Sequence, residues 1–406
     1  MKESVNFMLK KLSAVICIAI SLVIMIGCFT LPASANGGNF SSLADWQGDL
    51  DEDTPITEIN IPGTHDSAMF GIGSGIFDGV GFAHNQDLTF EQQLNIGVRY
   101  IDGRFCYEDE KNPDETENIF CCHGGYIPEM NNKDISLKDM LNELNKFLDK
   151  HPTEFIFLPY KCESEEDMKS AELNALLTSI FYDYVNSKSE RYMMALPGGR
   201  VPTVKEAQGH IIFTINSNSG IFCDYCTLAN TYSKGTDEKV KELSRVFDIN
   251  NVRPLTKESR RYSRNSDKGP ECDRSPRLIH TSCYQAPFRT PARTSADIYK
   301  WILGKVEKLD GVAHPTFHKG YYYGIVLFDY VKEDECRLII NLNNAKSTVP
   351  ADSNTDESAV PATATALGDS EIVIAVLIAA VVLAAIITVL VVIIIKNKHK
   401  KTADIK

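Results

Sequence analysis

Two histidines, each set in a turn of small residues, could act as the acid and the base of one reaction. His65 lies within Ile61–Ser67, and His123 precedes two glycines. The pKa of histidine is near neutrality, so one imidazole can accept a proton while the other donates one. Arg104, between them in the chain, offers a fixed cation with planar donors that suit phosphate oxygens. Together the three residues predict metal-independent cleavage of a phosphodiester, and we expect no cofactor.

The elements that would position these residues alternate along the chain. Strand-like apolar runs lie at Ile56–Ile61, Val98–Phe105, Asn118–Cys122, Phe155–Tyr160, His210–Ile215, Leu278–Ser282 and Gly324–Tyr330. Helix-like segments lie at Thr89–Leu94, Ser136–Lys150 with Ser136 as its cap, Ser164–Val185, Glu238–Val246 and Thr294–Leu309. This alternation predicts a parallel α/β sheet, closed as a barrel or open. The segment 253–274, dense in Arg, Lys, Ser and Pro, predicts a surface loop.

The strand ends predict one shared pocket. In barrel enzymes, catalytic groups follow the C-terminal ends of the strands. Five chemically suitable side chains fall at or just after such ends here: His65, Arg104, His123, Lys161 and Asp329.

The first residues predict a secretory signal peptide over 1–35. Three lysines precede an apolar run over 12–31, and Ala33-Ser34-Ala35 offers a cleavage site of small residues. Gly27-Cys28 inside the run leaves a lipoprotein cleavage site as an alternative.

A second apolar stretch, over 371–395, is long enough to cross a bilayer as a helix. The lysines of 396–406 would place a basic tail in the cytosol. Residues 345–370, rich in Ala, Ser, Thr, Pro and Asp, predict a disordered stalk. We therefore expect a globular body over 36–344 outside the cell, held by a single span. Val360–Ala364 loosely resembles the sorting signals of Gram-positive bacteria, so attachment to the cell wall stays an alternative.

Composition limits the partners and the cysteine chemistry. The chain has 54 acidic and 42 basic residues, which argues against nucleic acid as a partner. Two of the 11 cysteines, Cys17 and Cys28, precede residue 36, which leaves nine. Outside the cytosol most of the nine are expected to pair. Cys223 and Cys226 predict a local disulfide rather than half of a zinc site.

The order of the motifs resembles the X-domain of phosphatidylinositol-specific phospholipase C. Five segments carry the resemblance: Ile61–Ser67, Gly97–Arg104, His123-Gly124, Phe147–Lys161 and Gly324–Tyr330. It extends from about residue 45 to about residue 343. The resemblance implies a distorted TIM (βα)8-like barrel with one active site at its C-terminal rim. Since Arg104 stands where the eukaryotic enzymes have an acidic calcium ligand, the chain resembles the metal-independent bacterial type.

The resemblance also implies catalytic roles. His65 would be the general base that deprotonates the inositol 2-hydroxyl, and Asp329 would orient it. His123 would be the general acid that protonates the diacylglycerol oxygen, with Asp66 as its partner. Arg104 would hold the non-bridging oxygens of the phosphate.

The residues that would bind the head group match less well. Lys161 and Tyr232 correspond to inositol contacts of the family. Asn216 or a neighbour stands where bacterial members carry an arginine, and Asn230 stands where they carry an aspartate.

The implied activity is a phosphatidylinositol lyase that releases diacylglycerol and inositol 1,2-cyclic phosphate from a membrane lipid. Three alternatives remain: cleavage of glycosylphosphatidylinositol anchors, a metal-dependent diesterase of the glycerophosphodiesterase or sphingomyelinase kind, and a non-catalytic X-domain that binds lipid. Arg104 argues against the metal-dependent class. The presence of both histidines and the arginine argues against loss of activity.

Overall fold

The computed structural model describes residues 40, 42–72, 80–107, 112–163, 167–194, 201–215, 226–228, 235–255, 277–283 and 290–345. All of them belong to one compact unit, Gly37–Thr348. The strands of its main sheet are β1 Ile61–Thr64, β2 Tyr100–Ile101, β3 Gly103–Tyr107, β4 Ile119–Cys121, β7 Ile156–Cys162, β8 Tyr192–Met194, β9 Ile211–Ile215, β10 Cys226–Leu228, β12 Arg277–His280 and β16 Ile325–Phe328.

The described α-helices are α2 Val80–Ala83, α3 Phe90–Asn95, α4 Leu137–Lys150, α5 Asp167–Ser187, α6 Val204–Ala207, α7 Gly235–Phe247, α9 Pro291–Ile302 and α10 Glu333–Asn341. Three small antiparallel sheets of two strands each complete the described part: β5 Glu129–Met130 with β6 Lys133–Asp134, β11 Arg253–Pro254 with β15 Tyr321–Tyr322, and β13 Lys308–Leu309 with β14 Val312–Ala313. Short 3₁₀ helices lie at Trp46–Asp49, Ile56–Glu58, Glu115–Glu117 and Ile249–Asn251.

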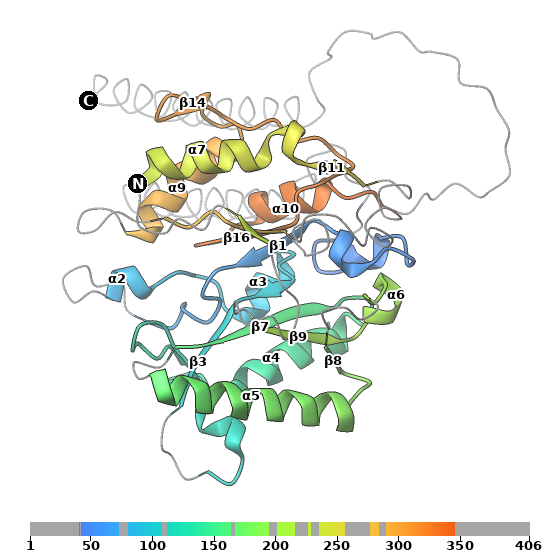
Figure 1. Ribbon diagram of the computed structural model, residues 1–406, viewed down its shortest axis with the longest axis vertical. Coiled ribbons are helices and arrows are strands. Elements are labelled where there is room, and N and C mark those ends of the chain that lie inside the picture. The colour runs from blue at the N-terminus through green and yellow to red at the C-terminus, as the bar shows by residue number, and fades with distance from the viewer. Residues whose placement is uncertain are drawn as a thin grey trace, which may run out of the picture. The chain divides into compact units, whose positions relative to one another are not determined.

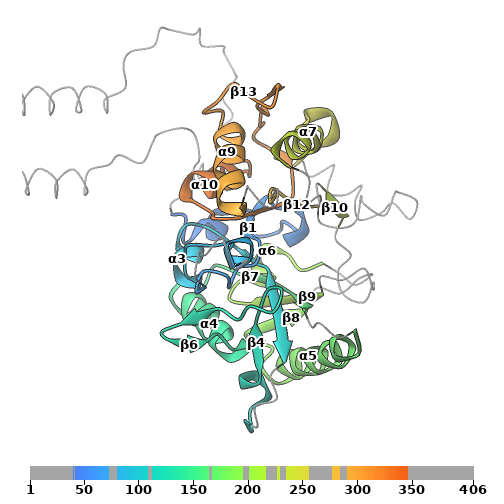
Figure 2. The ribbon, with the colours of Figure 1, turned by 90° about the vertical axis from the view of Figure 1, so that its left-hand side faces the viewer.

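The ten-stranded sheet has the order β10-β12-β16-β1-β2-β7-β3-β4, and β9 pairs with both β7 and β8. Helices α7, α9 and α10 lie beyond β1 and β16, while α4 and α5 lie on the opposite side, beyond β7 and β9 (Figures 1 and 2). The mixed α/β architecture is therefore confirmed. The two groups of helices cover different strands: α10 packs on β1, whereas α5 packs on β7 and β8.

One strand departs from the predicted parallel sheet. The run Asn118–Cys122 forms β4, which pairs antiparallel with β3, and Phe105 lies opposite Cys121. A parallel pair needs a long crossover that is usually helical. The described residues between Tyr107 and Ile119 contain only the 3₁₀ helix Glu115–Glu117, so the chain returns as a hairpin.

The first strand begins later than the sequence predicts. Ile56–Glu58 forms a 3₁₀ helix, and β1 covers Ile61–Thr64 instead. Glycine is required in this strand: a Cβ on Gly63 would lie 2.5 Å from Leu327 Cδ2 and 2.9 Å from Tyr100 Cβ. The missing side chain lets β1 lie close between β16 and β2, which sets the positions of the residues that follow these strands.

The helices match the predicted segments in part. Ser136 caps α4 by accepting a hydrogen bond from Asp139 N at 3.1 Å, as its sequence predicts. The predicted helix Thr294–Leu309 is wrong at its end, because α9 stops at Ile302. Gly304 at φ +66° turns the chain into the β13–β14 hairpin. Helix α10 was not predicted.

The cysteines do not form the expected number of disulfides. Cys121, Cys122, Cys162 and Cys336 carry thiols. At most four of the other five cysteines after residue 36 could pair, so the expectation that most of the nine pair is wrong. Cys121 and Cys336 are fully buried, and they pack as small apolar side chains. Cys223 lies outside the described residues.

Several predictions about the ends of the chain lie outside the described residues. They are the signal peptide (1–35), the stalk (345–370, apart from its first residue), the apolar stretch (371–395) and the basic tail (396–406). Within the described part, no helix has the length and apolar character needed to span a bilayer. Most of the predicted surface loop, 256–274, also lies outside.

Candidate active site

The residues that follow β1 and β16 meet across the sheet. These strands pair in parallel up to Thr64 and Phe328, and His65 N donates to Phe328 O at 3.0 Å. His65 Nδ1 then lies 2.8 Å from Asp329 Oδ1, and both side chains are buried. The structure thus contains the contact predicted between residues that lie 264 positions apart in the chain.

The partners of His65 define its neutral tautomer. Arg104 Nη2 lies 2.6 Å from His65 Nε2. A guanidinium can only donate hydrogen bonds, so the neutral Nε2 accepts and the ring proton resides on Nδ1, facing Asp329. This tautomer presents a basic lone pair at Nε2, on the side of the arginine.

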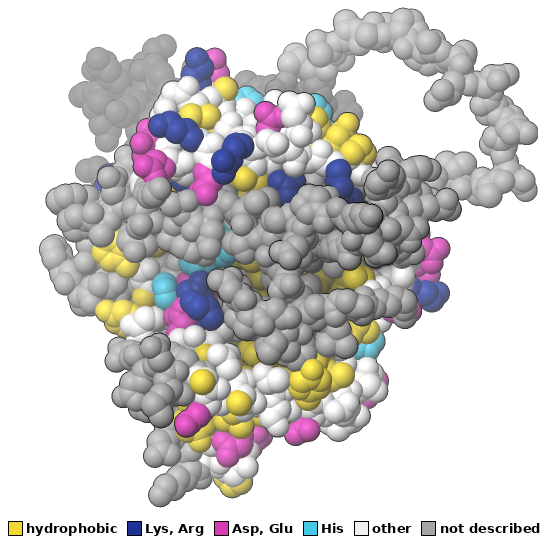
Figure 3. Space-filling model, in the orientation of Figure 1, with side chains coloured by type: hydrophobic (Ala, Val, Ile, Leu, Met, Phe, Trp, Pro, Cys, Tyr) yellow, Lys and Arg dark blue, Asp and Glu magenta, His cyan; other side chains and the backbone are white. Residues whose placement is uncertain are grey.

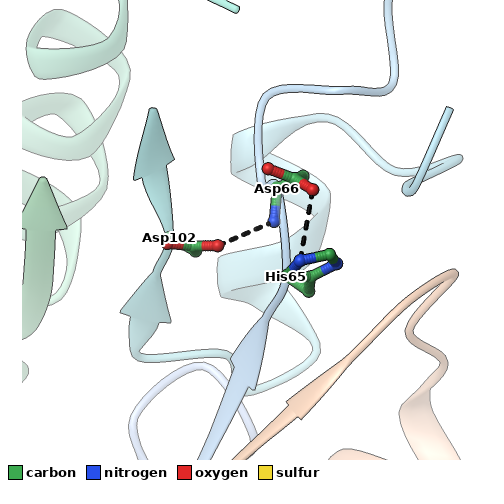
Figure 4. Close-up of side chains that lie close together, drawn as sticks. All are labelled: His65, Asp66 and Asp102. Atoms are coloured by element: carbon green, nitrogen blue, oxygen red, sulfur yellow. Dashed lines mark hydrogen bonds and ion pairs between the residues drawn. The ribbon is translucent and has the colours of Figure 1, made fainter. Parts of the chain in front are cut away.

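Carboxylates surround the guanidinium of Arg104. Its Nε lies 2.5 Å from Asp66 Oδ1, its Nη2 3.3 Å from Asp102 Oδ2, and its Nη1 2.7 Å from Glu163 Oε1. Asp102 occupies the break between β2 and β3, which the sequence predicts as one continuous strand. The break lets this side chain join the site, where it accepts a 3.2 Å hydrogen bond from Asp66 N (Figure 4).

Asp66 lies between the two histidines. Its Oδ2 is 3.2 Å from His65 Nε2 and 3.5 Å from His123 Nδ1. Its backbone adopts φ +46°, a conformation that is uncommon outside glycine and is costly to hold. The predicted pairing with His123 is present, but Asp66 also contacts Arg104 and His65. It therefore contacts three of the other four predicted catalytic side chains, namely His65, Arg104 and His123.

His123 lies in a tight turn after β4. Its main chain exchanges hydrogen bonds with Tyr126 at 2.9 and 3.0 Å, and Gly124 and Gly125 adopt φ +54° and +85°. Its ring centroid is 6.4 Å from that of His65. The side chain of His123 is 25% exposed, whereas that of His65 is 6% exposed. His123 is thus the histidine better placed to reach a group that leaves toward solvent.

Burial and neighbouring charges shift the pKa values of the ionisable groups in opposite directions. Burial lowers the pKa of His65, but the Asp66 and Asp329 carboxylates outweigh it, so the pKa is raised above its ordinary value. Burial raises the pKa of Asp66 despite Arg104. For Asp102, Arg104 and His65 outweigh the burial and lower the pKa to about 2. Asp102 is therefore a permanent anion at neutral pH.

Glu163 is a site residue that the sequence reasoning missed. It accepts hydrogen bonds from Lys161 Nζ at 3.0 Å and from Gly124 N at 3.1 Å, and it pairs with Arg104. Burial raises its pKa, but Arg104 and Lys161 outweigh this and lower it to about 2. The sequence does contain an indication of this role. Residues two apart in an extended chain face the same side, so Glu163 is expected to face the same side as Lys161.

The predicted head-group residues are only partly covered. Lys161 lies at the end of β7 with its side chain 46% exposed, close to Arg104 through their shared partner Glu163. Tyr232, Asn230 and Asn216 lie outside the described residues. On the face shown in Figure 3, acidic, basic and histidine side chains adjoin at one place.

Three side chains of the site could also hold a cation. His65, Asp66 and Asp102 place potential ligand atoms within 4.8 Å of one another. All three contact the guanidinium of Arg104. The guanidinium of Arg104 therefore contacts the same three side chains that would have to bind a divalent metal.

A family model described as PI-PLC X matches residues 53–194. The 1-phosphatidylinositol phosphodiesterase of Staphylococcus aureus is 27% identical over 205 residues, which cover 50% of this chain and 57% of that protein. A human PI-PLC X domain-containing protein 3 is 29% identical over 153 residues, 32% of this chain and 44% of that protein. The chain thus matches about half the length of these relatives.

Solved structures show a similar fold over a larger share of the chain than the sequence matches cover. A phosphatidylinositol-specific phospholipase C from Listeria monocytogenes aligns with a TM-score of 0.50 at 20% identity, over 75% of this chain and 99% of that one. A variant of the Staphylococcus aureus enzyme gives a TM-score of 0.53 at 20% identity, over 77% of this chain and 100% of that one. These alignments confirm the expected barrel-like α/β fold of the globular body, whereas the signal peptide and the transmembrane helix stay predictions.

Proposed function

Residues 53–194 belong to the phosphatidylinositol-specific phospholipase C X-domain family, and from that premise we propose that this protein cleaves the glycerol–phosphate bond of phosphatidylinositol. The products would be diacylglycerol and inositol 1,2-cyclic phosphate. One observation carries the proposal: two histidines with ring centroids 6.4 Å apart share the Asp66 carboxylate, which also pairs with the partly buried Arg104. This geometry supplies a base, an acid and a phosphate-binding cation within one site.

In the proposed reaction, His65 Nε2 accepts the proton of the inositol 2-hydroxyl. The resulting oxygen attacks the phosphorus of the same molecule, and the bond from phosphorus to the glycerol oxygen breaks. Asp329 holds the Nδ1 proton and stabilises the imidazolium that forms. Because attacking and reacting groups belong to one head group, the attack is intramolecular and has a large entropic advantage.

His123 donates a proton to the departing glycerol oxygen. Its partial exposure suits a leaving group that stays attached to a lipid chain. Arg104 stabilises the charge that develops on the non-bridging oxygens of the phosphate. We assign Lys161 to the head group, because it is an exposed cation that shares Glu163 with Arg104. Tyr232 and Asn230 remain proposed head-group contacts on the strength of the resemblance.

The test of this function is release of water-soluble inositol phosphate from phosphatidylinositol vesicles, with and without EDTA. We expect full activity in the chelator, because Arg104 contacts the three side chains that would otherwise bind a cation. Activity that disappears in EDTA and returns with calcium would contradict the metal-independent mechanism. Release of free inositol, with phosphatidate left in the vesicle, would instead support the diesterase alternative.

We expect Asp329→Asn to lower kcat by about 10²-fold or more with little change in KM, because an amide cannot stabilise the protonated His65. The Asp329 carboxylate is one of the groups that raise the pKa of His65. Without it the pKa falls, so the base becomes neutral at a lower pH. The acidic limb of the pH profile of kcat/KM should therefore move to lower pH. A profile and rate like those of the wild type would reduce Asp329 to a structural role.

We also propose that the catalytic unit lies outside the cell and is tethered by the apolar segment 371–395. The support is the sequence pattern of that segment and of residues 1–35 and 396–406. Alkaline carbonate extraction of membranes should leave the protein in the pellet. Its release would argue against the anchor, and resistance even to detergent would favour the wall-attached alternative.

A further inference from the structure

The segment His84–Gln86 holds the chain where it leaves β16. Tyr330 N donates to Asn85 O at 2.6 Å, and Gln86 Nε2 donates to Phe328 O at 2.9 Å. The Tyr330 hydroxyl donates to His84 O at 2.6 Å, and Val331 N donates to Gln86 Oε1 at 3.3 Å. These contacts enclose Asp329 on both sides. The two segments are more than 240 residues apart in sequence, so only the fold brings them together.

Within this segment, the side chain of Asn85 contacts the reactive carboxylate. Asn85 Nδ2 donates to Asp329 Oδ1 at 3.1 Å, and the same oxygen lies 2.8 Å from His65 Nδ1. The amide must present its nitrogen here, because an amide oxygen would repel a carboxylate. Asn85 is 2% exposed, and no hydrogen bond within the described part of the protein reaches its Oδ1. The residue thus keeps one contact to Asp329 and leaves its own acceptor unsatisfied.

The main chain of Asp329 is fixed by other groups. The Tyr299 hydroxyl donates to Asp329 O, and the neighbouring Tyr330 N is held by the main chain of Asn85. A side-chain change at position 85 leaves these main-chain contacts in place. Loss of the Asn85 amide would therefore act on the orientation of the Asp329 carboxylate and not on the path of the chain.

We propose that Asn85 is a positioning residue that fixes the Asp329 carboxylate against His65 Nδ1, and through it the direction of the basic Nε2. The role is defined for the proposed lyase reaction, so it rests on that function. A carboxylate oxygen with two donors has a defined rotamer, whereas one with a single donor can rotate about its Cβ–Cγ bond. Catalytic groups need such support from their neighbours to stay within a fraction of an ångström of the productive geometry.

Asn85→Leu tests this proposal, because leucine has a similar size and no donor. We expect kcat on phosphatidylinositol to fall by about 10²-fold, the cost of a small misplacement of a catalytic group, with KM nearly unchanged. Proton NMR should show a low-field Nδ1–H resonance of His65 in the wild-type protein that is lost or broadened in the variant. Should the leucine variant fail to fold, Asn85→Ala removes the same donor without adding bulk.

Asn343→Leu is the matched control. Asn343 is also 2% exposed, and its Nδ2 donates to Asn60 O at 2.9 Å, before the start of β1 rather than at the site. This variant should lose thermal stability but keep the resonance and kcat. An unchanged His65 resonance with unchanged kcat in Asn85→Leu and Asn85→Ala would overturn the positioning role. The resonance does not depend on turnover, so a wild-type protein that fails to cleave phosphatidylinositol would refute the proposed function separately.

Discussion

His65→Ala and His123→Ala should each reduce cleavage of phosphatidylinositol by about 10²–10⁴-fold, the usual contribution of a positioned acid or base. The two variants should separate on an inositol phosphate ester of nitrophenol. Nitrophenolate leaves without a proton, so His123→Ala should recover much of its rate. His65→Ala should not, because the 2-hydroxyl still needs a base. Equal recovery would show that the acid and the base are reversed or misassigned.

The control for both variants is His151→Ala. His151 Nδ1 lies 2.6 Å from Asp45 Oδ1, so this histidine also has a carboxylate partner, but its ring stacks on Phe147 of α4. The variant should retain activity on both substrates. Circular dichroism and thermal melting of all three variants would show that any loss of rate arises from chemistry and not from unfolding.

Arg104→Lys should lower kcat by about 10²–10³-fold although the positive charge remains, the range measured for loss of one charge-stabilising donor. The guanidinium uses its three nitrogens to contact three carboxylates and His65, and one ammonium cannot reproduce that fork. Steady-state kinetics in EDTA provide the measurement. A lysine variant that keeps more than half of the activity would show that only the charge matters.

Arg191→Lys is the control for this substitution. Arg191 also pairs with an aspartate, Asp149, but at the surface of α4. Exposed pairs contribute little to stability, so this variant should behave like the wild type. The contrast separates the fork geometry of Arg104 from the general effect of exchanging arginine for lysine.

The strands were largely predictable from their apolar runs, but their boundaries and directions were not. Pro62 and Gly63 indicate a turn in the sequence, yet they lie within β1, because the packing of Leu327 and Tyr100 leaves room for nothing larger than glycine. The run that forms β4 has the same pattern as a parallel strand. Its antiparallel direction follows from the connection before it, which no local period reveals.

The candidate site was predictable where a residue lies at or just after the C-terminal end of a predicted strand. His65, Arg104, His123 and Asp329 were identified in this way, and the structure brings them together; their catalytic roles stay predictions. Nothing in the sequence pattern assigns a role to Asp102 or Asn85. Asp102 reaches the site because the strand breaks between β2 and β3. Asn85 reaches it through a contact with Asp329, more than 240 residues later in the chain. Patterns of period 2 or 3.6 carry no information on either feature.

Strands β1 and β16 are neighbours in the sheet, but the ribosome makes them at very different times. His65 leaves the ribosome 264 residues before Asp329, a delay of roughly 10–50 s at ordinary elongation rates. During that interval the nascent chain holds both histidines and the arginine, but His65 lacks the carboxylate that stabilises its protonated form. The proposed lyase would thus gain its full catalytic power only after most of the domain has been made. The order of the strands alone would then keep an incomplete chain from showing the proposed activity.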